Sequence, residues 1–521
     1  MGQQTIILDG KSLTIQQVAQ VAEQKAEVEI SQEAMERLRA ARELVLNWDS
    51  VHAPVYGFNT GVGINKDRQV HEKQYEQFNR SLIFSHCIGV KPEADEKTVR
   101  AAMLIRLNTL LLGYTGVQPE IAQMYKRFLN EGIHPVIPER ASVGAADLGN
   151  LAHIGLAMIG EGEVIYRGKR MNASEALKKA GIKSIVLGPK DGLAIASSNA
   201  FAAAKASLLL NEVKQLIDLS DIVFALSLEG LNGNISPLDE SVLRIRPFPG
   251  NLASAGLIKA CLEGSYLSLQ HLNRPLQDPL SFRGAFAVHG AVRDAIDYTE
   301  KNLLIQLNSS DDNPCVLVDE QRILSCSNYE VTTWVLAIEM LGQALAHLSK
   351  ISCFRTIKLS SPNFSGLPRF LSPDNGQNVL AFSTIQKTFA ALDAEIRHLS
   401  NPINADFIAL SGEIEDHANN SVQVVDKTAK IVDNLYYILG IEAMHAAQAI
   451  DLRKDISLGH GTELAYKMIR QEVPFLDADR NLSVDIEKMY KLLKSGEICR
   501  AVRDKLGEIC WGVMRCHNDQ D

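Results

Sequence analysis

Residues 199–230 read NAFAAAKASLLLNEVKQLIDLSDIVFALSLEG. Alanine, leucine and isoleucine dominate this stretch, and its apolar positions recur on nearly every side of a helix. Such a pattern predicts one long helix that is buried on most of its faces. Further helical patterns cover residues 32–47, 97–113, 332–355, 376–400, 421–450 and 484–507.

Long helices after residue 190 favour a helix bundle. Thr14 and Gln17 resemble a capping box at the start of a further helix. Strand-like segments are short: Thr5–Leu8, Glu163–Tyr166, and Val316–Val318 with Ile323–Leu324. We therefore expect a mainly α fold with an elongated central helix bundle. The expected parts are a smaller mixed α/β part, residues 1–190, and the long-helix bundle, residues 191–521.

Composition excludes several classes of function. Hydrophobic residues make up 46% and charged residues 22% of the 521 residues, which is typical of a soluble globular protein. A net charge of −9 without a basic stripe argues against a nucleic-acid partner. The N-terminus lacks a secretory pattern, and apolar stretches such as 192–204 are shorter than the ~20 residues of a membrane span. Eight cysteines without C-x-x-C spacing predict reduced thiols, no metal site and a cytoplasmic location.

Residues 139–163 read ERASVGAADLGNLAHIGLAMIGEGE. This segment resembles the signature of the histidine/phenylalanine/tyrosine ammonia-lyase family, roughly G-S-V-G-A-S-G-D-L-x-P-L-A-H. In that family the internal Ala-Ser-Gly cyclises into an electrophilic methylidene-imidazolone ring, the prosthetic group of deamination. Here SVGA (142–145) is followed directly by Ala146 and Asp147, and Asn150 stands at the proline position. The missing serine predicts that no such ring forms and that the chain uses no cofactor.

Two further departures concern the same ring. DGLAIASSNA (191–200) corresponds to the family's E-G-L-A-L-I-N-G-T-Q, so Ser197 replaces the asparagine that holds the ring. LQDPLSFRGAF (276–286) corresponds to Q-D-x-Y-S-x-R, so Leu280 replaces a catalytic tyrosine. Because the losses gather around one group, they indicate specialisation rather than decay.

VYGFNTGVG (55–63) matches the family's Y-G-x-N-T-G-x-G loop, and the resemblance makes Tyr56 the base that removes the β-proton. Its glycines allow close backbone approach, which is typical of an active-site loop. The alternative is a core tyrosine beside an ordinary turn. A phenol has a pKa near 10, so nearby positive charge or hydrogen-bond donors must stabilise its anion.

The resemblance also assigns substrate contacts. His86, in FNRSLIFSHCIGV (78–90), contacts the substrate ring or its carboxylate neighbourhood, with a structural histidine as the alternative. Arg283 binds the substrate carboxylate, because its planar guanidinium fits a carboxylate bidentately.

NSSDDNP (308–314) matches N-S-x-x-D-N-P, so Asn313 hydrogen-bonds the substrate, although Asp-Asn-Pro is also a common turn sequence. In SCSNYE (325–330), which replaces S-G-G-N-F-H, Tyr329 takes the aromatic position over the substrate. Asn199 completes the expected substrate-binding set.

Two charged residues stand out beyond these motifs. Lys387 is the only charged residue between Asp374 and Asp393, within an otherwise apolar helical pattern. It is either an interior ion pair or a catalytic cation. SGEIEDHANN (411–420) resembles S-x-N-Q-E-D-H, which makes Glu415 the family's site glutamate and Glu413 an added carboxylate. Because residues i and i+2 do not share a helix face, we expect this segment to be irregular. A solvated acidic turn is the alternative.

The resemblance covers essentially the whole chain and implies a mainly helical homotetramer whose sites are shared between subunits. A quaternary trimethylammonium has no lone pair to attack an electrophile and leaves without protonation, so its substrate needs no ring. With its histidine-branch features at His86 and Glu415, the chain most resembles the ergothionases, which release trimethylamine from ergothioneine, a trimethylated histidine betaine, to give thiourocanate. Tyr56, Lys387 and Glu413 are the expected catalytic residues. The alternatives are an ammonia-lyase acting on histidine and a non-catalytic scaffold of the same fold.

Overall fold

The computed structural model describes residues 4–23, 25–48, 54–269, 274–374 and 376–512. Contacts divide the chain into two compact units. Unit 1 contains Met1–Asn211, Thr299–Ile338 and Pro402–Asp426; unit 2 contains Glu212–Tyr298, Glu339–Asn401 and Lys427–Asp521. Both units are discontinuous, because four long helices contribute residues to each. The division into consecutive parts at residue 190 stays a prediction about sequence organisation.

Unit 1 holds the described strands, which form small separate sheets. β1 (Gln4–Leu8) pairs in parallel with β2 (Ala26–Ile30), and β8 (Cys315–Leu317) forms a hairpin with β9 (Arg322–Leu324). β1, β8, β9 and β6 (Glu163–Tyr166) confirm the strand-like segments of the sequence, whereas the other strands, β2 among them, were missed. The remaining strands are β3 (Val90–Glu93) paired with β5 (Pro138–Arg140), and the antiparallel sheet β4 (Ile133–Pro135), β6 (Glu163–Tyr166), β7 (Lys169–Asn172).

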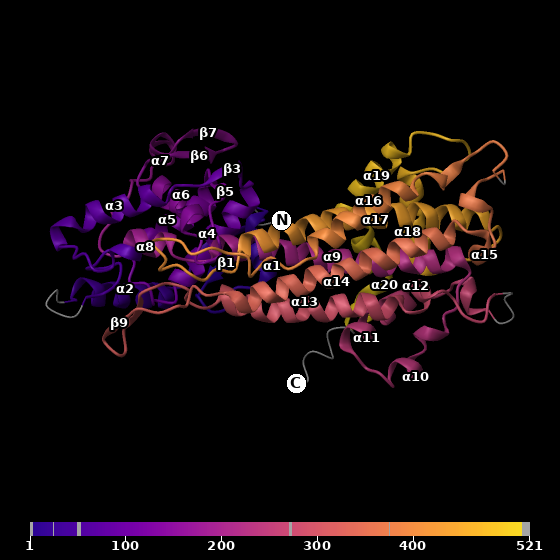
Figure 1. Cartoon of the computed structure of the whole chain (residues 1–521), viewed down its shortest axis with the longest axis horizontal. Coiled ribbons are helices and arrows are strands. Elements are labelled where there is room, and N and C mark those ends of the chain that lie inside the picture. The colour runs from indigo at the N-terminus through magenta and orange to yellow at the C-terminus, as the bar shows by residue number, and fades with distance from the viewer. Residues whose placement is uncertain (1–3, 24, 49–53, 270–273, 375, 513–521) are drawn as a thin grey trace. The chain divides into compact units, whose positions relative to one another are not determined.

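Helices of unit 1 surround α4 (Glu96–Leu110), in which every side chain from Thr98 to Leu110 is buried. Thr14 caps α1 (Ile15–Ala22) through the predicted capping box with Gln17. Figure 1 shows α7 (Ala173–Ala180) beside the β6–β7 hairpin, against which it packs. The other helices of unit 1 are α1 (Ile15–Ala22), α2 (Gln32–Leu46), α3 (Tyr75–His86), α5 (Pro119–Glu131), α6 (Leu148–Met158), α7 (Ala173–Ala180) and α8 (Asp191–Ala196).

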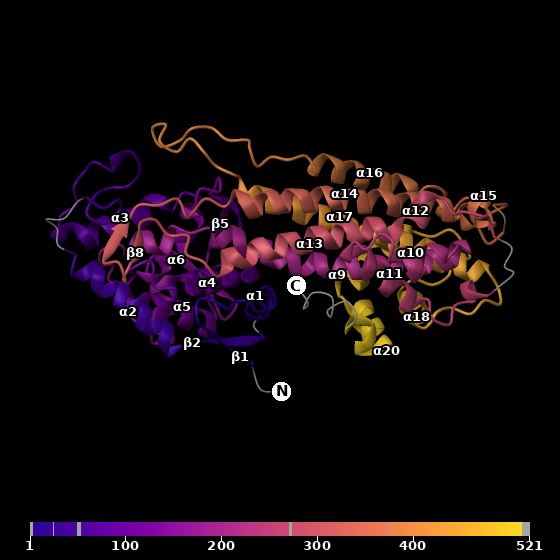
Figure 2. The ribbon, with the colours of Figure 1, turned by 90° about the horizontal axis from the view of Figure 1, so that it is seen from below.

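Long helices dominate unit 2, as the sequence predicted. Figure 2 shows α13 and α14 running alongside one another. Within unit 2, Arg355 of α14 donates to Glu442 of α17 at 2.6 and 2.9 Å, and Ser227 of α9 donates to the same carboxylate at 2.7 Å. The helices shared by both units are α9 (Ala200–Leu231), α13 (Ala285–Leu307), α14 (Thr332–Leu359) and α17 (Ser421–Leu452).

Unit 2 also contains α10 (Glu240–Leu243), α11 (Pro249–Cys261), α12 (Leu280–Arg283), α15 (Pro362–Ser365), α16 (Gln386–Leu399), α18 (His460–Glu472), α19 (Leu482–Lys494) and α20 (Glu497–Gly512). Single 3₁₀ turns occur at Gly63–Asn65, Glu72–Gln74, Ser236–Leu238, Tyr266–Ser268, Arg369–Leu371 and Ala381–Ser383.

Two helix predictions were wrong in extent. The pattern at 376–400 becomes helical only at Gln386, because the Asp479 carboxylate accepts the N–H groups of Leu380 and Ala381 at 2.9 Å and fixes a different backbone. The pattern at 484–507 is split between α19 and α20 by Gly496, whose φ of +70° ends the first helix.

One described stretch, Asp191–Leu231, is long and apolar enough to cross a membrane, and 89% of its most apolar window is buried inside the structure. This stretch extends beyond the apolar run at 192–204 that the sequence singled out. Its burial is typical of a core helix. The cysteines whose side chains are described are free thiols: Cys87, Cys261, Cys315, Cys326, Cys353 and Cys499. Cys510 and Cys516 lie outside the described side chains.

Candidate active site

Tyr56 lies in the loop between α2 and α3, half-buried. Its hydroxyl oxygen accepts a hydrogen bond from the Gly63 N–H at 2.9 Å, so the loop closes on its own tyrosine. Burial raises the pKa of the Tyr56 phenol, and the negative charges of Glu415 and of an ionised Tyr329 act in the same direction. The Gly63 N–H opposes that rise in the pKa. The loop thus supplies one donor to a phenolate.

Segment 410–415 packs against the Tyr56 loop. A Cβ on Gly63 would lie 2.9 Å from Ser411 Oγ, and one on Gly412 would lie 3.3 Å from Ile64 Cγ1. Leu410 and Glu415 pair through two backbone hydrogen bonds, of 2.9 and 3.2 Å. The predicted irregular backbone is confirmed for this segment. It brings the Glu415 carboxylate into electrostatic reach of Tyr56 and Tyr329.

Glu413 sits in an unusual backbone conformation. Ser411, Gly412 and Glu413 have φ angles of +52°, +68° and +68°, which place two non-glycine residues in the left-handed region. Such conformations cost about 1–3 kcal/mol each and gather at functional sites. The Glu413 side chain is exposed, and its catalytic role stays a prediction.

Segment 325–330 contacts residues 417–419, which follow segment 410–415 in the chain, through the side chain of Glu330. His417 Nε2 lies 3.2 Å from Glu330 Oε2, and Asn419 Nδ2 donates to Glu330 Oε1 at 3.2 Å. The His417 ring packs edge-on against Phe407, with centroids 5.3 Å apart. Sequence reasoning missed Glu330, although the replacement of the family's histidine by glutamate at this position was a visible signal.

A pocket of about 530 Å³ opens beside the altered signature segment. Two carboxylates, Asp406 and Glu415, face mostly apolar walls, which suit an organic ligand with positive charge. Its lining residues are Val143, Ala145, Asp406, Phe407, Ile408, Leu410, Glu415, His417, Ala418 and Asn420.

The altered segment forms an ordinary hydrogen-bonded turn. Ser142 Oγ donates to Asp147 Oδ1 at 2.7 Å and accepts the Gly144 N–H at 2.9 Å. Ala146 adopts a φ of +60°. The residues present do not fit the family's prosthetic ring, because the turn offers no serine between Ala145 and Asp147 and its one hydroxyl is engaged elsewhere.

Asp147 and Asn199 are buried and hydrogen-bond to residues of this turn. Asp147 accepts the Ala202 N–H at 2.8 Å, and burial raises the pKa of its carboxyl to about 6. Asn199 Nδ2 donates to the Gly144 carbonyl oxygen at 3.0 Å, and Asn199 Oδ1 is a buried acceptor without a hydrogen-bond partner among the described residues. The structure therefore places Asn199 behind the turn, and its contact with substrate stays a prediction.

His86 and Asn313 each present one defined group. His86 Nδ1 lies 2.8 Å from the Leu82 carbonyl oxygen, so this nitrogen carries a proton and donates it to that oxygen. Asn313 Oδ1 accepts the Cys326 N–H at 2.9 Å, which leaves the Asn313 amide nitrogen as a donor suited to a carboxylate. The contacts of His86 and Asn313 with substrate stay predictions.

Arg283 and Lys387 belong to unit 2, and their contact with substrate stays a prediction. Arg283 ends α12, is half-buried and donates to the Gln277 side chain. Lys387 is exposed in the first turn of α16, while Ile385 and Phe389 beside it are buried. The Lys387 side chain is thus exposed in the single chain, and the choice between an interior ion pair and a catalytic cation stays a prediction.

Comparison with known proteins identifies the family of this chain. The aromatic amino acid lyase family model matches residues 13–471. The histidine ammonia-lyase of Myxococcus xanthus is 38% identical over 505 residues, covering 96% of this chain and 99% of the relative.

Two solved structures extend the likeness to the fold. Ergothionase from Treponema denticola, an ergothioneine-degrading enzyme solved with desmethyl-ergothioneine sulfonic acid, is 47% identical with a TM-score of 0.93, covering 95% of this chain and 99% of that one. Histidine ammonia-lyase from Trypanosoma cruzi is 31% identical with a TM-score of 0.88, covering 97% and 96%. The mainly α prediction is thereby confirmed as a histidine ammonia-lyase-type fold. The chain is a carbon–nitrogen lyase that belongs to the aromatic amino acid lyase family.

Proposed function

We propose that this lyase eliminates trimethylamine from a trimethylated histidine betaine, with ergothioneine giving thiourocanate, and that it does so without a methylidene-imidazolone ring. The observation that carries the proposal is the turn at 142–147. The ring-forming serine is missing from this turn, and the Ser142 hydroxyl is hydrogen-bonded to Asp147. The likeness to Treponema denticola ergothionase supports the choice of substrate.

The chemistry needs no electrophile. Tyr56 takes the β-proton, the electrons of the broken C–H bond form the Cα=Cβ bond, and the Cα–N bond breaks so that trimethylamine leaves with its electron pair. Such a base contributes about 10²- to 10⁴-fold to the rate. The Gly63 N–H stabilises the phenolate, while burial and Glu415 disfavour it. Additional positive charge is therefore required, and Lys387 and Arg283 are the residues we assign to supply it.

Substrate recognition uses several groups of different character. We assign the substrate carboxylate to Arg283 and to the Asn313 amide nitrogen, and the imidazole-type ring to His86, Glu415 and Tyr329. Glu413 and Lys387 activate the ring, because negative charge delocalised into a hydrogen-bonded ring makes the β-proton more acidic. The pocket beside the altered turn combines carboxylates with apolar walls, as a trimethylammonium group requires.

A second candidate is histidine ammonia-lyase activity, which the name of the 38% identical relative from Myxococcus xanthus favours. A homotetramer with sites shared between subunits and a cytoplasmic location are further proposals, drawn from the family resemblance and from the scattered cysteines.

The deciding experiment incubates the purified chain separately with ergothioneine, hercynine and histidine. Trimethylamine, ammonia and the acrylate chromophore are measured for each substrate. Trimethylamine with a conjugated acrylate from a betaine supports the proposal. Ammonia with urocanate from histidine, and no reaction of either betaine, replaces it with the second candidate. The absence of any product from all three would contradict both candidate functions.

A further inference from the structure

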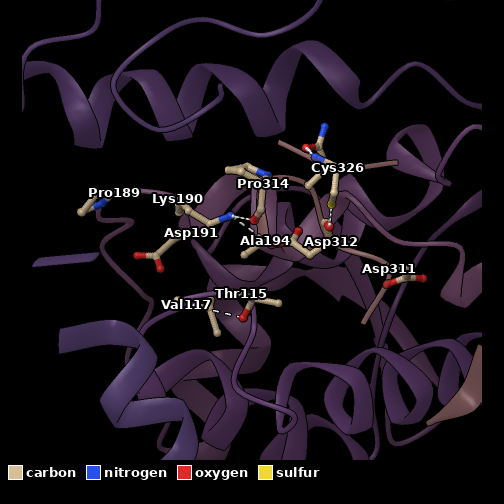
Figure 3. A network of polar contacts seen from close by, with 12 residues as sticks. Thr115, Val117, Pro189, Lys190, Asp191, Ala194, Asp311, Asp312, Pro314 and Cys326 are labelled. Atoms are coloured by element: carbon tan, nitrogen blue, oxygen red, sulfur yellow. Dashed lines mark hydrogen bonds and ion pairs between the residues drawn. The ribbon is translucent and has the colours of Figure 1, made fainter. Parts of the chain in front are cut away.

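Lys190 carries a fully buried charge directly behind the loop that holds Asn313. Its Nζ donates to Asp312 Oδ2 at 3.0 Å and to the Pro314 carbonyl oxygen at 2.7 Å, and neither ionic side chain is exposed at all. Figure 3 shows the lysine pointing at these two groups from the start of α8. Its two acceptors therefore belong to the residues on either side of Asn313.

Cys326 also makes hydrogen bonds to the loop that carries Asn313. Its N–H donates to Asn313 Oδ1 at 2.9 Å. Its thiol donates to the Asp312 carbonyl oxygen at 3.1 Å, as Figure 3 shows. Asn313 thus has its side-chain oxygen fixed and both neighbouring residues bound, so its amide nitrogen has a defined direction. Asn313 itself receives no bond from Lys190, which acts only on its neighbours.

Arg106 links this loop to the segment beneath the altered turn. Arg106 Nη1 lies 3.2 Å from Asp311 Oδ1, and Nη2 lies 3.5 Å from Asp312 Oδ1. Asp311 Oδ2 in turn accepts the Ser198 hydroxyl and the Asn199 N–H, each at 2.8 Å. One buried network therefore joins two segments of the candidate site.

We propose that Lys190 is a positioning residue for substrate binding, which holds the Asn313 amide nitrogen in the direction of the substrate carboxylate through Asp312 and Pro314. This inference rests on the substrate contact proposed for Asn313. It does not depend on which leaving group the enzyme releases. A buried ion pair is by itself weak support for stability, and a role in fixing one loop conformation gives the pair a reason to persist.

The test is a double-mutant cycle between Lys190→Met and Asn313→Ala, run with whichever of ergothioneine, hercynine and histidine the wild-type enzyme turns over. Substrate affinity is measured as KM and, for slow variants, as a dissociation constant by calorimetry. We expect each single variant to raise KM about tenfold or more, in the range of a lost hydrogen bond to a charged group. We expect the double variant to bind no worse than Asn313→Ala alone, because Lys190 acts through that residue.

Arg100→Met is the matched control. Arg100 is a buried cation of the same unit that donates to the Val21 and Leu129 carbonyl oxygens at 2.9 and 2.8 Å, away from the candidate site. We expect it to lower the melting temperature without changing KM. If Lys190→Met does not fold, the pair Lys190→Met/Asp312→Asn, which removes both charges of the ion pair, takes its place in the cycle.

Two outcomes overturn the inference. A normal KM in Lys190→Met, or an equal loss of affinity in the presence and absence of Asn313, would make Lys190 a purely structural residue. If Asn313→Ala itself binds normally, the premise fails and the inference with it, while product analysis still decides the reaction separately.

Discussion

Replacing Tyr56 with phenylalanine removes one oxygen atom, the one that accepts the Gly63 N–H at 2.9 Å. As a general base that oxygen contributes about 10²- to 10⁴-fold to kcat, or about 3–5 kcal/mol of transition-state stabilisation. The ground-state complex does not use the base, so we expect KM to stay within a few-fold. Loss of an acceptor for a half-buried N–H costs about 1 kcal/mol of stability.

The pH dependence gives a second measure of the same residue. Only the phenolate is a base, so kcat/KM rises with pH up to the pKa of Tyr56. Burial, then Glu415 and Tyr329, raise that pKa against the Gly63 hydrogen bond. Glu415→Gln removes one of the negative charges that raise the pKa of Tyr56. We therefore expect the rising limb of the kcat/KM profile to move to lower pH in this variant, even if KM changes.

The assay is initial-rate measurement of acrylate formation from pH 6 to pH 11, beyond the ordinary pKa of a phenol, on the substrate that product analysis selects. Tyr75→Phe is the control, because Tyr75 is a partly buried tyrosine of the same unit that stacks on Phe58 with ring centroids 5.6 Å apart. We expect normal turnover from it. A Tyr56→Phe enzyme with kcat within tenfold of wild type would refute the assignment of Tyr56 as the base.

Three further results are expected. Intact mass should equal that of the unmodified chain, and a deficit of two water molecules would show that a prosthetic ring forms. Lys387→Met and Glu413→Gln should each lower kcat by about 10²-fold or more, and the double variant by much less than the product, whereas normal turnover with lower thermal stability in Lys387→Met would make the lysine structural. Burial lowers the pKa of His134 from 6.5 to about 4, so the unfolded chain binds more protons between these values and stability rises with pH across this window, by up to about 3 kcal/mol. The melting temperature of His134→Gln should therefore fall less than that of the wild type when the pH is lowered from 7.5 to 5. An equal fall in both proteins would show that the pKa of His134 is the same in the folded and unfolded chains.

The local pattern of apolar residues was sufficient to predict helices that are buried along most of their length. The stretch at 199–230 became α9 within one residue at each end, and the Thr14–Gln17 box caps α1. The pattern failed where distant groups compete for the backbone. Residues 376–385 have helical periodicity, yet Asp479, about a hundred residues away, binds two of their N–H groups and prevents the helix.

By itself the sequence determined the family, the mainly helical fold and the missing serine of the signature segment, because each of these is a matter of residue type and spacing. Tertiary structure alone decided how the groups face one another. It brought Glu415 and Tyr329 into electrostatic reach of Tyr56, and it placed the Lys190 charge behind Asn313. Buried polar groups must form hydrogen bonds or ion pairs, and their partners often lie far away in the chain. A pattern along the sequence does not show which distant residues those partners are.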